Sequence, residues 1–385
     1  MFDDTKLAQM GTDSEANFGI INPPIYRAST IHFPTVESFN GRFERRFDEV
    51  VYGSYGTPTT KALEEVIASL ENAHGSIILP SGTAAISLSF MSLLKPGDHV
   101  LVSDGAYKST RSFCETFLSK LGVASSYFNP KIGAEIADQF RSETRLVFLE
   151  SPSSFTFEIQ DVPTLAAACQ DNGILTAIDN TWASPLYFQP LDHGVDISIQ
   201  AATKYLSGHS DVMMGTISTR DDGILKLIKD VTIQFGYSVS PADCYLALRG
   251  VRTMGVRLRQ HQETALKLIN WLKDQSEVSE ILYPGWPGNP GFDIWRRDFK
   301  GASGLFGVIL KTRNKASVSR FIEGMKHFKI GASWGGYESL IIPSYPVRSH
   351  ASPAWEERGS LLRIHAGLED SRDLIEDLEK GFLRI

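Results

Sequence analysis

The chain has 385 residues, of which 42% are hydrophobic and 22% charged, so it can bury a large core in two or three domains. Its net charge is -7, without long blocks of one sign, which gives no electrostatic case for nucleic acid. The N-terminus lacks the basic start of a signal peptide, and the most apolar segment, residues 82–94, is too short and polar to span a bilayer. We therefore expect a cytoplasmic protein without nucleic-acid or membrane partners.

The cysteines are three in number and widely spaced: Cys114, Cys169 and Cys244. This spacing fits neither a disulfide framework nor a zinc site. We expect no metal centre, and we expect the three thiols to be buried in a reducing cytoplasm.

Residues 1–56 have little periodicity and predict an N-terminal arm. The prolines of "INPPIYRAST" favour extended chain, and "GRFERRFDEV" is strongly charged. A disordered tail is the alternative, and the aromatic residues of this region argue against it. We expect the arm to contact a neighbouring subunit of a homo-oligomer.

Residues 57–249 alternate helical stretches with short apolar runs. A helix from residue 60 is expected to stop at Gly75, because glycine commonly ends helices. The later runs are rich in Val, Ile and Leu and lack polar alternation, as in strands covered on both faces of a parallel sheet. We expect an α/β domain with strands near 76–80, 99–103, 145–151, 174–180 and 195–202 and helices near 82–91, 109–121 and 163–172.

Residues 250–385 have a different pattern and predict a smaller α+β domain. Residues 250–275 could form one long amphipathic helix, which leads into the glycine- and proline-rich loop "GWPGNPGF". Further elements are expected as strands near 304–310 and 360–367 and helices near 317–328 and 371–382.

Polar side chains follow several of the predicted strands of the first sheet. Ligands of open α/β sheets bind beyond the carboxyl ends of the strands, so these side chains should meet at one rim. The first strand leads into Ser81-Gly82-Thr83 at a helix start, and later strands lead to Tyr107, Asp179 and Lys204. Each of these residues also has an ordinary explanation. Ser81-Gly82-Thr83 could be a turn with a helix cap, Tyr107 a core aromatic residue, Asp179 a turn cap and Lys204 a loop lysine. Convergence of all four favours a ligand site.

Lys204 is the most informative of these residues. It follows small and apolar residues, and the nearest charges in the sequence are Asp196 and Asp211. A desolvated lysine forms a Schiff base with a carbonyl, a buried carboxylate keeps a pyridine nitrogen protonated, and a helix N-terminus binds phosphate. The residues therefore predict a pyridoxal 5'-phosphate site with the cofactor attached to Lys204.

Ordered sequence blocks from about Asn22 to the C-terminus also resemble the Cys/Met-metabolism pyridoxal-phosphate enzymes: "YGSYGTPTTKALE", "LPSGTAA", "GAYKSTRSF", "ESPSSFTFEI", "IDNTWASPLYFQPLDHGVDIS", "SIQAATKYLSGHSD", "RGVRTMGVRLRQH", "SWGGYESL" and "LLRIHAGLED". Within this family the chain looks most similar to bacterial cystathionine β-lyases. The resemblance implies the type I, aspartate-aminotransferase-like fold, with a mostly parallel large domain and a smaller C-terminal α+β domain.

The resemblance also implies roles for individual residues. Lys204 would hold the cofactor and act as the base at Cα, and Asp179 would pair with the pyridinium nitrogen. Tyr107 would stack on the ring, and Tyr107 and Tyr52 would belong to the catalytic set. Phosphate would bind Gly82, Thr83 and Thr203, with Tyr52 reaching in from a neighbouring subunit. Ser154, Ser333 and Trp334 would line the substrate pocket.

Arg363 would bind the substrate α-carboxylate as a bidentate fork. The alternative for Arg363 is a structural pairing with Glu369 or Asp370. One block departs from the family pattern, because Tyr52-Gly53-Ser54 stands where many relatives have Tyr-x-Arg. An arginine that pairs with the phosphate is therefore missing, and the candidates to replace it are Arg42, Arg45 and Arg46 of the arm.

The activity implied is β-elimination of L-cystathionine to homocysteine, pyruvate and ammonia. The alternatives on the same scaffold are γ-lyase, γ-synthase or sulfhydrylase, and cysteine-desulfhydrase-type activity. A cofactor-binding regulator is an alternative from a different class. Lys204, Asp179 and Arg363 argue against it, since a regulator needs no carboxylate clamp.

Overall fold

The computed structural model describes residues 1–350 and 355–385. A seven-stranded sheet has the order β1-β7-β6-β5-β4-β2-β3. All neighbours from β6 to β3 are parallel, whereas β7 is antiparallel to both β1 and β6. The predicted mostly parallel sheet is thus confirmed. Its strands are β1 (Gly75–Leu79), β2 (His99–Ser103), β3 (Ala124–Phe128), β4 (Thr144–Glu150), β5 (Leu175–Asp179), β6 (Ile197–Gln200) and β7 (Gly215–Thr219).

Both faces of this sheet are buried, which explains the absence of polar alternation. In β2, Val100 and Val102 pack into one hydrophobic cluster and Leu101 into another, because successive side chains of a strand point to opposite faces. The first cluster is completed by α4 (Gly82–Leu93), α5 (Lys108–Thr116) and α8 (Asp222–Gln234). The opposite face is covered by α3 (Pro58–Leu70), α6 (Val162–Asp171) and α9 (Pro241–Arg252).

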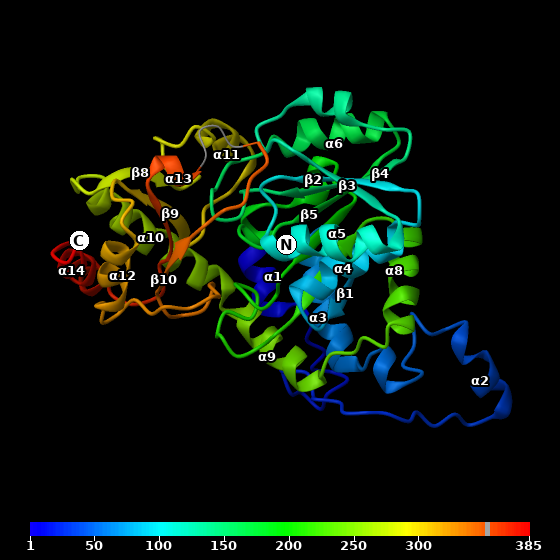
Figure 1. The fold of residues 1–385 in the computed structure, drawn as a ribbon. Helices are drawn as coiled ribbons and strands as arrows, with labels where there is room; N and C mark the ends of the chain where they lie inside the picture. The colour runs from blue at the N-terminus through cyan, green and yellow to red at the C-terminus, as the bar shows by residue number, and fades with distance from the viewer. Residues whose placement is uncertain (351–354) are drawn as a thin grey trace.

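A second, antiparallel sheet has the order β10-β11-β9-β8. Figure 1 shows it at the opposite end of the molecule from α8, with α12 and α14 beside it. The elements of this part are β8 (Val278–Leu282), β9 (Leu305–Leu310), β10 (Leu340–Ser344), β11 (Ser360–His365), α10 (Met254–Leu272), α11 (Phe292–Asp298), α12 (Lys315–Glu323), α13 (Trp355–Arg358) and α14 (Ser371–Phe382).

Two expected helix boundaries are wrong. Helix α3 ends at Leu70, and Gly75 is instead the first residue of β1. The helix stops earlier because Asn72 has a left-handed backbone, with φ of 51°, a conformation that asparagine tolerates at helix ends. The long helix expected over residues 250–275 is two helices, α9 and α10, that meet at Thr253.

The arm has two parts. Helix α1 (Asp3–Gln9) packs against α3, α9 and α10, while the segment around α2 (Val36–Asn40) projects away from the rest of the chain in Figure 1. Apolar side chains on the arm are exposed, among them Phe18 (97%), Ile21 (72%) and Val36 (75%).

The cysteines and the apolar helices can also be compared with the predictions. The three cysteines are buried and free, as expected. Within residues 1–350 and 355–385, no helix combines the length and apolar character that crossing a membrane requires.

Candidate active site

A cavity of about 330 Å³ opens beyond the carboxyl ends of the large sheet, where β11 also approaches. This volume falls in the range of pockets for small ligands. Its walls come from strand ends, from the start of α4 and from residues 332–334. The side chains that line it include ten of the eleven predicted site residues: Gly82, Thr83, Tyr107, Ser154, Asp179, Thr203, Lys204, Ser333, Trp334 and Arg363.

Lys204 lies in a turn after β6 and projects into the cavity. Its Nζ donates a hydrogen bond of 2.6 Å to Ser333 Oγ and lies 5.4 Å from the centre of the Trp334 ring. Burial, together with the nearby Arg363 cation and against the opposing effect of Asp179, lowers the pKa of Lys204 to about 8. The hydrogen-bond partner of the amine, Ser333, is a neutral hydroxyl. Because no opposite charge among the described residues contacts the amine directly, it loses its proton far more easily than an exposed lysine does.

Asp179 is the last residue of β5. Thr181 donates to its Oδ1 from both the backbone N–H (3.0 Å) and the hydroxyl, and that hydroxyl accepts from the Ala201 N–H at 2.8 Å. Burial raises the pKa of Asp179, while the Thr181 bonds and Lys204 act in the opposite direction. Both bonds that the described residues donate to this carboxylate end on Oδ1, so Oδ2 can serve a ligand.

Glu150 is a cavity residue that the sequence reasoning missed. It ends β4 and is the register partner of Asp179 on β5. Its Oε2 accepts a 2.7 Å hydrogen bond from the backbone N–H of Tyr107. Burial, and then the Asp179 charge, raise its pKa well above the usual value. A carboxylate directly after an apolar strand next to that of Asp179 was the signal available in the sequence.

Tyr107 forms an aromatic wall of the cavity. It precedes α5, and its ring is 40% exposed and stacks on Phe155, with centroids 6.4 Å apart. Phe155 in turn lies 5.5 Å from the guanidinium of Arg363. A flat ligand ring would therefore find an aromatic face on this side of Lys204.

The start of α4 lines one end of the cavity and can bind an anion there. Gly82 and Thr83 are the first two residues of this 12-residue helix, and Ser81 caps it by accepting from the Ala84 N–H at 3.0 Å. The first N–H groups of a helix lack partners within the helix, so they suit phosphate. Thr203 also lines the cavity.

The Thr203 hydroxyl is engaged within the chain. It donates to the Met214 carbonyl at 3.1 Å and accepts from the Met214 N–H at 2.9 Å. A hydrogen bond from this hydroxyl to phosphate therefore requires that it turn away from the Met214 carbonyl.

Arg363 lies on β11 and is only 5% exposed. Its Nη2 donates to the backbone carbonyls of residues 331–333 at 2.9 to 3.3 Å. Burial lowers the pKa of Arg363 to about 10. These contacts orient the guanidinium in the cavity without neutralising its charge.

The two acids proposed as structural partners of Arg363 are engaged elsewhere. Glu369 accepts from the backbone N–H of Ser339 at 2.8 Å and from its hydroxyl at 2.7 Å. Asp370 pairs with Arg372 at 2.6 Å. The alternative explanation for Arg363 is therefore wrong, and within residues 1–350 and 355–385 no carboxylate pairs with this buried cation, which faces the cavity.

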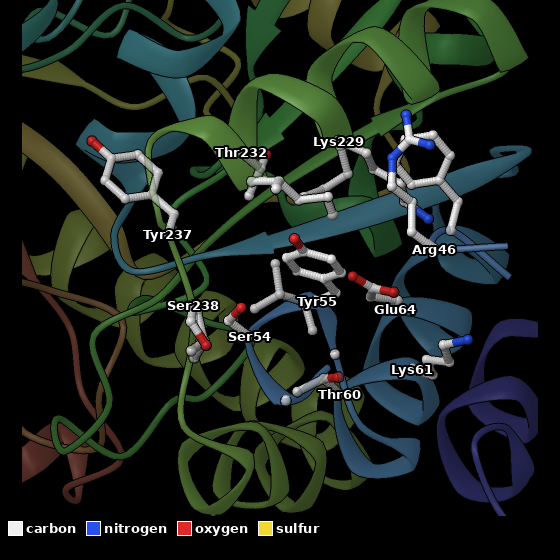
Figure 2. A pocket seen from close by; sticks show the side chains of 17 residues that line it. Arg46, Ser54, Tyr55, Thr60, Lys61, Glu64, Lys229, Thr232, Tyr237 and Ser238 are labelled. Carbon is white, nitrogen blue, oxygen red and sulfur yellow. The ribbon is translucent and has the colours of Figure 1, made fainter. Parts of the chain in front are cut away.

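Tyr52 is the predicted site residue that does not line the cavity. Its ring packs edge-to-face on Tyr55, with centroids 5.9 Å apart. Nearby, Ser54 borders a smaller pocket between α3 and α8, which Figure 2 shows together with Arg46. Arg46 is paired with Asp230 at 2.7 Å.

The other two arginines considered for the phosphate, Arg45 and Arg42, contact other residues of the arm. Arg45 pairs with Glu49 at 2.9 Å, and the Arg42 guanidinium lies 3.8 Å from the centre of the Phe39 ring. Neither lines the cavity of its own chain.

Comparisons with known proteins agree with this geometry. A family model described as Cys/Met metabolism PLP-dependent enzyme matches residues 4–383. The chain is 44% identical to a putative cystathionine beta-lyase of Rhizobium johnstonii, over 98% of this chain and 95% of that protein. It is 41% identical to the cystathionine beta-lyase of Escherichia coli, over 99% and 98%.

Among solved structures, a cystathionine gamma-lyase from Lactobacillus plantarum superposes with a TM-score of 0.90 at 30% identity, covering 100% of this chain and 99% of that one. This likeness confirms the predicted fold class. The chain therefore belongs to the Cys/Met metabolism family of PLP-dependent enzymes.

Proposed function

We propose that this chain is a pyridoxal-phosphate-dependent carbon–sulfur lyase that splits L-cystathionine by β-elimination. The observation that carries the proposal is the meeting of Lys204, Asp179 and Arg363 in one cavity. The similarity to proteins named cystathionine beta-lyase supports the choice of substrate. The overall reaction converts L-cystathionine and water into homocysteine, pyruvate and ammonia.

The donor set of the cavity fits pyridoxal 5'-phosphate. Lys204 offers an amine of lowered pKa to the aldehyde, and Oδ2 of Asp179 can accept from a protonated ring nitrogen. Tyr107 offers a face for the ring, and Gly82 and Thr83 offer helix N-terminal N–H groups to the phosphate. We assign the cofactor to these five residues.

Bound pyridoxal phosphate supplies an electron sink for the electron pair that remains at Cα when a proton is removed. The chain's own part begins with Arg363, which would hold the substrate α-carboxylate through the guanidinium nitrogens not bonded to residues 331–333. This contact fixes the Cα–H bond toward Lys204. The uncharged Lys204 amine then removes the proton from Cα, since its lowered pKa suits a general base.

The proton stays close to the site of bond breaking. Ser333 Oγ, 2.6 Å from Lys204 Nζ, would hold the protonated amine in place. As the Cβ–S bond breaks, its electron pair goes to sulfur, and Lys204 can return the proton to the departing thiolate. Trp334 and Phe155 add apolar surface to the lining of the cavity. The remaining three carbons and the nitrogen leave as pyruvate and ammonia after hydrolysis.

γ-Elimination or γ-replacement is the second candidate function. It is favoured by the whole-chain similarity to the structure named cystathionine gamma-lyase. γ-Chemistry requires removal of a second proton, at Cβ, and the relatives of 44% and 41% identity are named cystathionine beta-lyase, against 30% for the gamma-lyase structure. We therefore rank it second.

We also propose that the protein works as a cytoplasmic homo-oligomer, with a tetramer as the expected form. The exposed apolar side chains of the arm and the position of Tyr52 outside the cavity of its own chain support shared sites. In such an assembly, the arm of one subunit would complete the site of the next.

The direct test supplies L-cystathionine to the purified protein loaded with pyridoxal phosphate and measures both keto acids. Pyruvate with stoichiometric homocysteine is the expected result, and Lys204→Ala should abolish it. Borohydride should also fix the cofactor to the peptide that contains Lys204. Formation of 2-oxobutyrate and cysteine instead would establish the γ-lyase, and attachment at another lysine would remove Lys204 from the site.

A further inference from the structure

Residues 333–338, the turn of the block "SWGGYESL", belong to no helix or strand, and the first two of them, Ser333 and Trp334, line the cavity. The turn lies between the Lys204 segment and β11. Such a segment has few backbone bonds of its own, so its position depends on what holds it from either side.

On one side, the turn packs closely on the Lys204 segment. Gly335 has a left-handed backbone, with φ of 86°, and a Cβ there would lie 3.0 Å from Cα of Lys204. A Cβ at Gly336 would lie 2.0 Å from the Ser210 hydroxyl, and that hydroxyl donates to the Glu338 carboxylate at 2.6 Å. Glycine at position 335 therefore lets the turn pack on Lys204, and glycine at position 336 leaves room for Ser210 and Glu338.

On the other side, one buried imidazole holds both ends of the turn. The N–H of Gly335 donates to His365 Nε2 at 3.1 Å, and His365 Nδ1 bonds to the Glu338 carbonyl at 3.0 Å. Since a carbonyl only accepts, Nδ1 carries the proton and Nε2 is the acceptor. His365 stands two residues after Arg363 on β11, so both side chains lie on the same face of the strand.

We propose that His365 is a positioning residue that sets the distance between Ser333 and Lys204 by holding the turn through its neutral imidazole. Arg363 holds the carbonyls of residues 331–333 and His365 holds Gly335 and Glu338, so β11 fixes the whole turn. The Ser333 hydroxyl thereby stays beside the Lys204 amine. The expected effect of His365 on turnover rests on the proposed function, whereas its effect on the position of the turn does not.

The surroundings of His365 agree with a permanently neutral ring. Burial lowers its pKa well below the usual value, and the neighbouring His261 lowers it further. A proton on Nε2 would place two donors face to face at Gly335. The imidazole therefore acts as a fixed donor–acceptor pair.

Two variants and a matched control test this role. His365→Leu keeps an apolar side chain but removes both hydrogen bonds, whereas His365→Gln retains one donor and one acceptor. His261→Leu is the control, because His261 is equally buried and lies 5.1 Å from His365 but bonds to the Ala366 carbonyl instead of the turn. This variant measures the effect of a substitution in the same buried region that leaves the two hydrogen bonds between His365 and the turn intact.

Hydrogen exchange of the apoprotein provides the first readout, because it requires no catalysis. The peptide that covers residues 333–339 should exchange at least about tenfold faster in His365→Leu than in the wild type, and should stay protected in His365→Gln and His261→Leu. In the loaded enzyme, kcat/KM should fall about tenfold or more in His365→Leu alone and recover in His365→Gln.

Equal effects of His365→Leu and His261→Leu on exchange, or a glutamine variant no better than leucine, would overturn the proposal. A wild-type enzyme that forms no pyruvate would instead refute the proposed function, and the exchange result would still decide the role of His365. The two failures are therefore distinguishable.

Discussion

At Lys204, the structure places an amine beside a hydroxyl rather than a carboxylate. An ammonium group that is buried without an opposite charge loses hydration energy, so its neutral form is favoured. Asp179 attracts the proton, yet burial and Arg363 together outweigh it, which leaves the pKa near 8. The site thus holds a lysine that is uncharged often enough at neutral pH to act as a nucleophile and base.

Acylation of the apoprotein by a small reagent, followed by peptide mass spectrometry, measures this pKa directly. The labelling rate of Lys204 should rise with a midpoint near pH 8, well below the ordinary value for a lysine side chain. Arg363→Met should raise the midpoint, because a cation that disfavours the charged amine is removed. Asp179→Asn should lower it, because an attractive charge is lost. A midpoint near 10.5 in the wild type would contradict this description.

Arg363→Lys tests the carboxylate clamp. Lysine keeps the charge but not the planar fork, so kcat/KM should fall by roughly one to two orders of magnitude or more. The absorption spectrum of the bound cofactor should stay intact, since Arg363 belongs to β11 and the assigned cofactor contacts do not. The control is Arg372→Lys, which changes an exposed arginine paired with Asp370. Near-normal turnover in Arg363→Lys would remove this residue from the site.

At the scale of elements, Glu71 links the end of α3 to β6. It is fully buried, and its Oε1 accepts from the Ser198 hydroxyl and the Gln200 amide, both at 3.0 Å. Burial raises its pKa to about 7, above the 4.5 of an ordinary glutamate. A raised pKa means that the folded state binds the proton more tightly than the unfolded chain does. The stability it contributes is therefore full below about pH 4.5 and lost as the pH rises through 7.

Glu71→Gln should accordingly stabilise the protein at about pH 8 by roughly 1–3 kcal/mol, because glutamine keeps the Oε1 acceptor and carries no charge. At about pH 5 the two proteins should differ little. Urea titrations at both pH values measure this, with the exposed Glu65→Gln on the same helix as control. An unchanged stability at pH 8 would show that Glu71 titrates normally.

Five of the seven strands of the large sheet could be predicted from the sequence because they are apolar runs buried on both faces. Strand β7 escaped prediction because its hydroxyl side chains are satisfied across the sheet, as in the 2.7 Å bond between Ser218 and Ser76. Strand β3 escaped because it lies at the sheet edge and is partly exposed. Local composition does not reveal either situation.

The break between α9 and α10 has a long-range cause. Arg257 folds back so that its guanidinium bonds to the carbonyls of Gly250 and Tyr205 and to the Thr253 hydroxyl. Gly250 also packs on the backbone of Ser207, with no room for a Cβ. The helix thus bends to receive the Lys204 segment, a contact that helical periodicity cannot indicate.

The candidate site could be predicted where a residue follows a strand, as with Asp179 and Lys204. The residues that hold those side chains could not, because they come from distant parts of the chain. Thr181 orients Asp179, Glu150 holds Tyr107, and His365 holds the turn beside Lys204. Each acts through a hydrogen bond that exists only in the folded chain.

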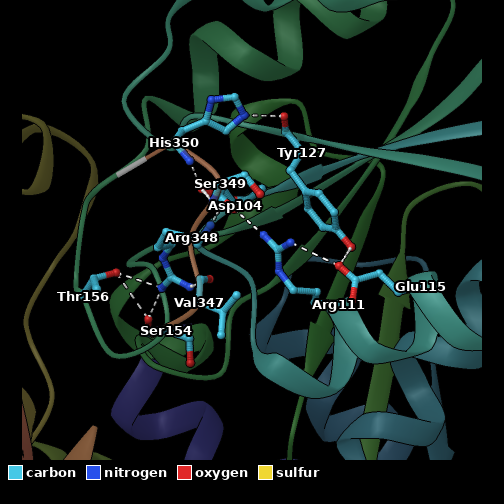
Figure 3. A network of polar contacts seen from close by, with 12 residues as sticks. Asp104, Arg111, Glu115, Tyr127, Ser154, Thr156, Val347, Arg348, Ser349 and His350 are labelled. Atoms are coloured by element: carbon cyan, nitrogen blue, oxygen red, sulfur yellow. Dashed lines mark hydrogen bonds and ion pairs between the residues drawn. The ribbon is translucent and has the colours of Figure 1, made fainter. Parts of the chain in front are cut away.

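At the scale of the whole molecule, a strap of residues 347–350 ties the C-terminal part to the large sheet. Figure 3 shows its central contact, Asp104, which accepts from the N–H groups of Ser349 (2.7 Å) and His350 (2.8 Å) and pairs with Arg111. Arg348 bonds to Ser154 and Thr156 beside the cavity. The strap therefore joins the two loops that carry Tyr107 and Ser154.

Asp104→Asn should weaken this connection. An amide in place of a buried carboxylate leaves Arg111 with Glu115 as its remaining partner, at 3.2 Å, so the loss of the charged contact should cost about 1–3 kcal/mol of unfolding free energy. KM should rise because the loops beside the cavity lose their support. Denaturant unfolding and steady-state kinetics check both effects, with the exposed Asp138→Asn as control. A stability equal to that of the control would show that the strap is held by other contacts.

The arm leads to a prediction about assembly. Exposed apolar side chains such as Phe18 and Val36 are expected to lie against a neighbouring subunit. Phe18→Glu with Val36→Glu should therefore shift the sedimentation coefficient to a smaller species and reduce activity. Leu227→Glu, a change on the exposed surface of α8, is the control. A catalytically active monomer of the unaltered chain would refute shared sites.

The position of β7 also sets an order of events during synthesis. Strand β1 pairs with β7 and not with any strand made soon after it, as Gly75 opposite Thr219 shows. On the ribosome, β1 and the start of α4 must therefore wait until residue 219 has emerged, with an open strand edge that invites mispairing. Arg363 arrives later still. A nascent chain can thus neither close its large sheet nor complete its ligand cavity until most of it is made.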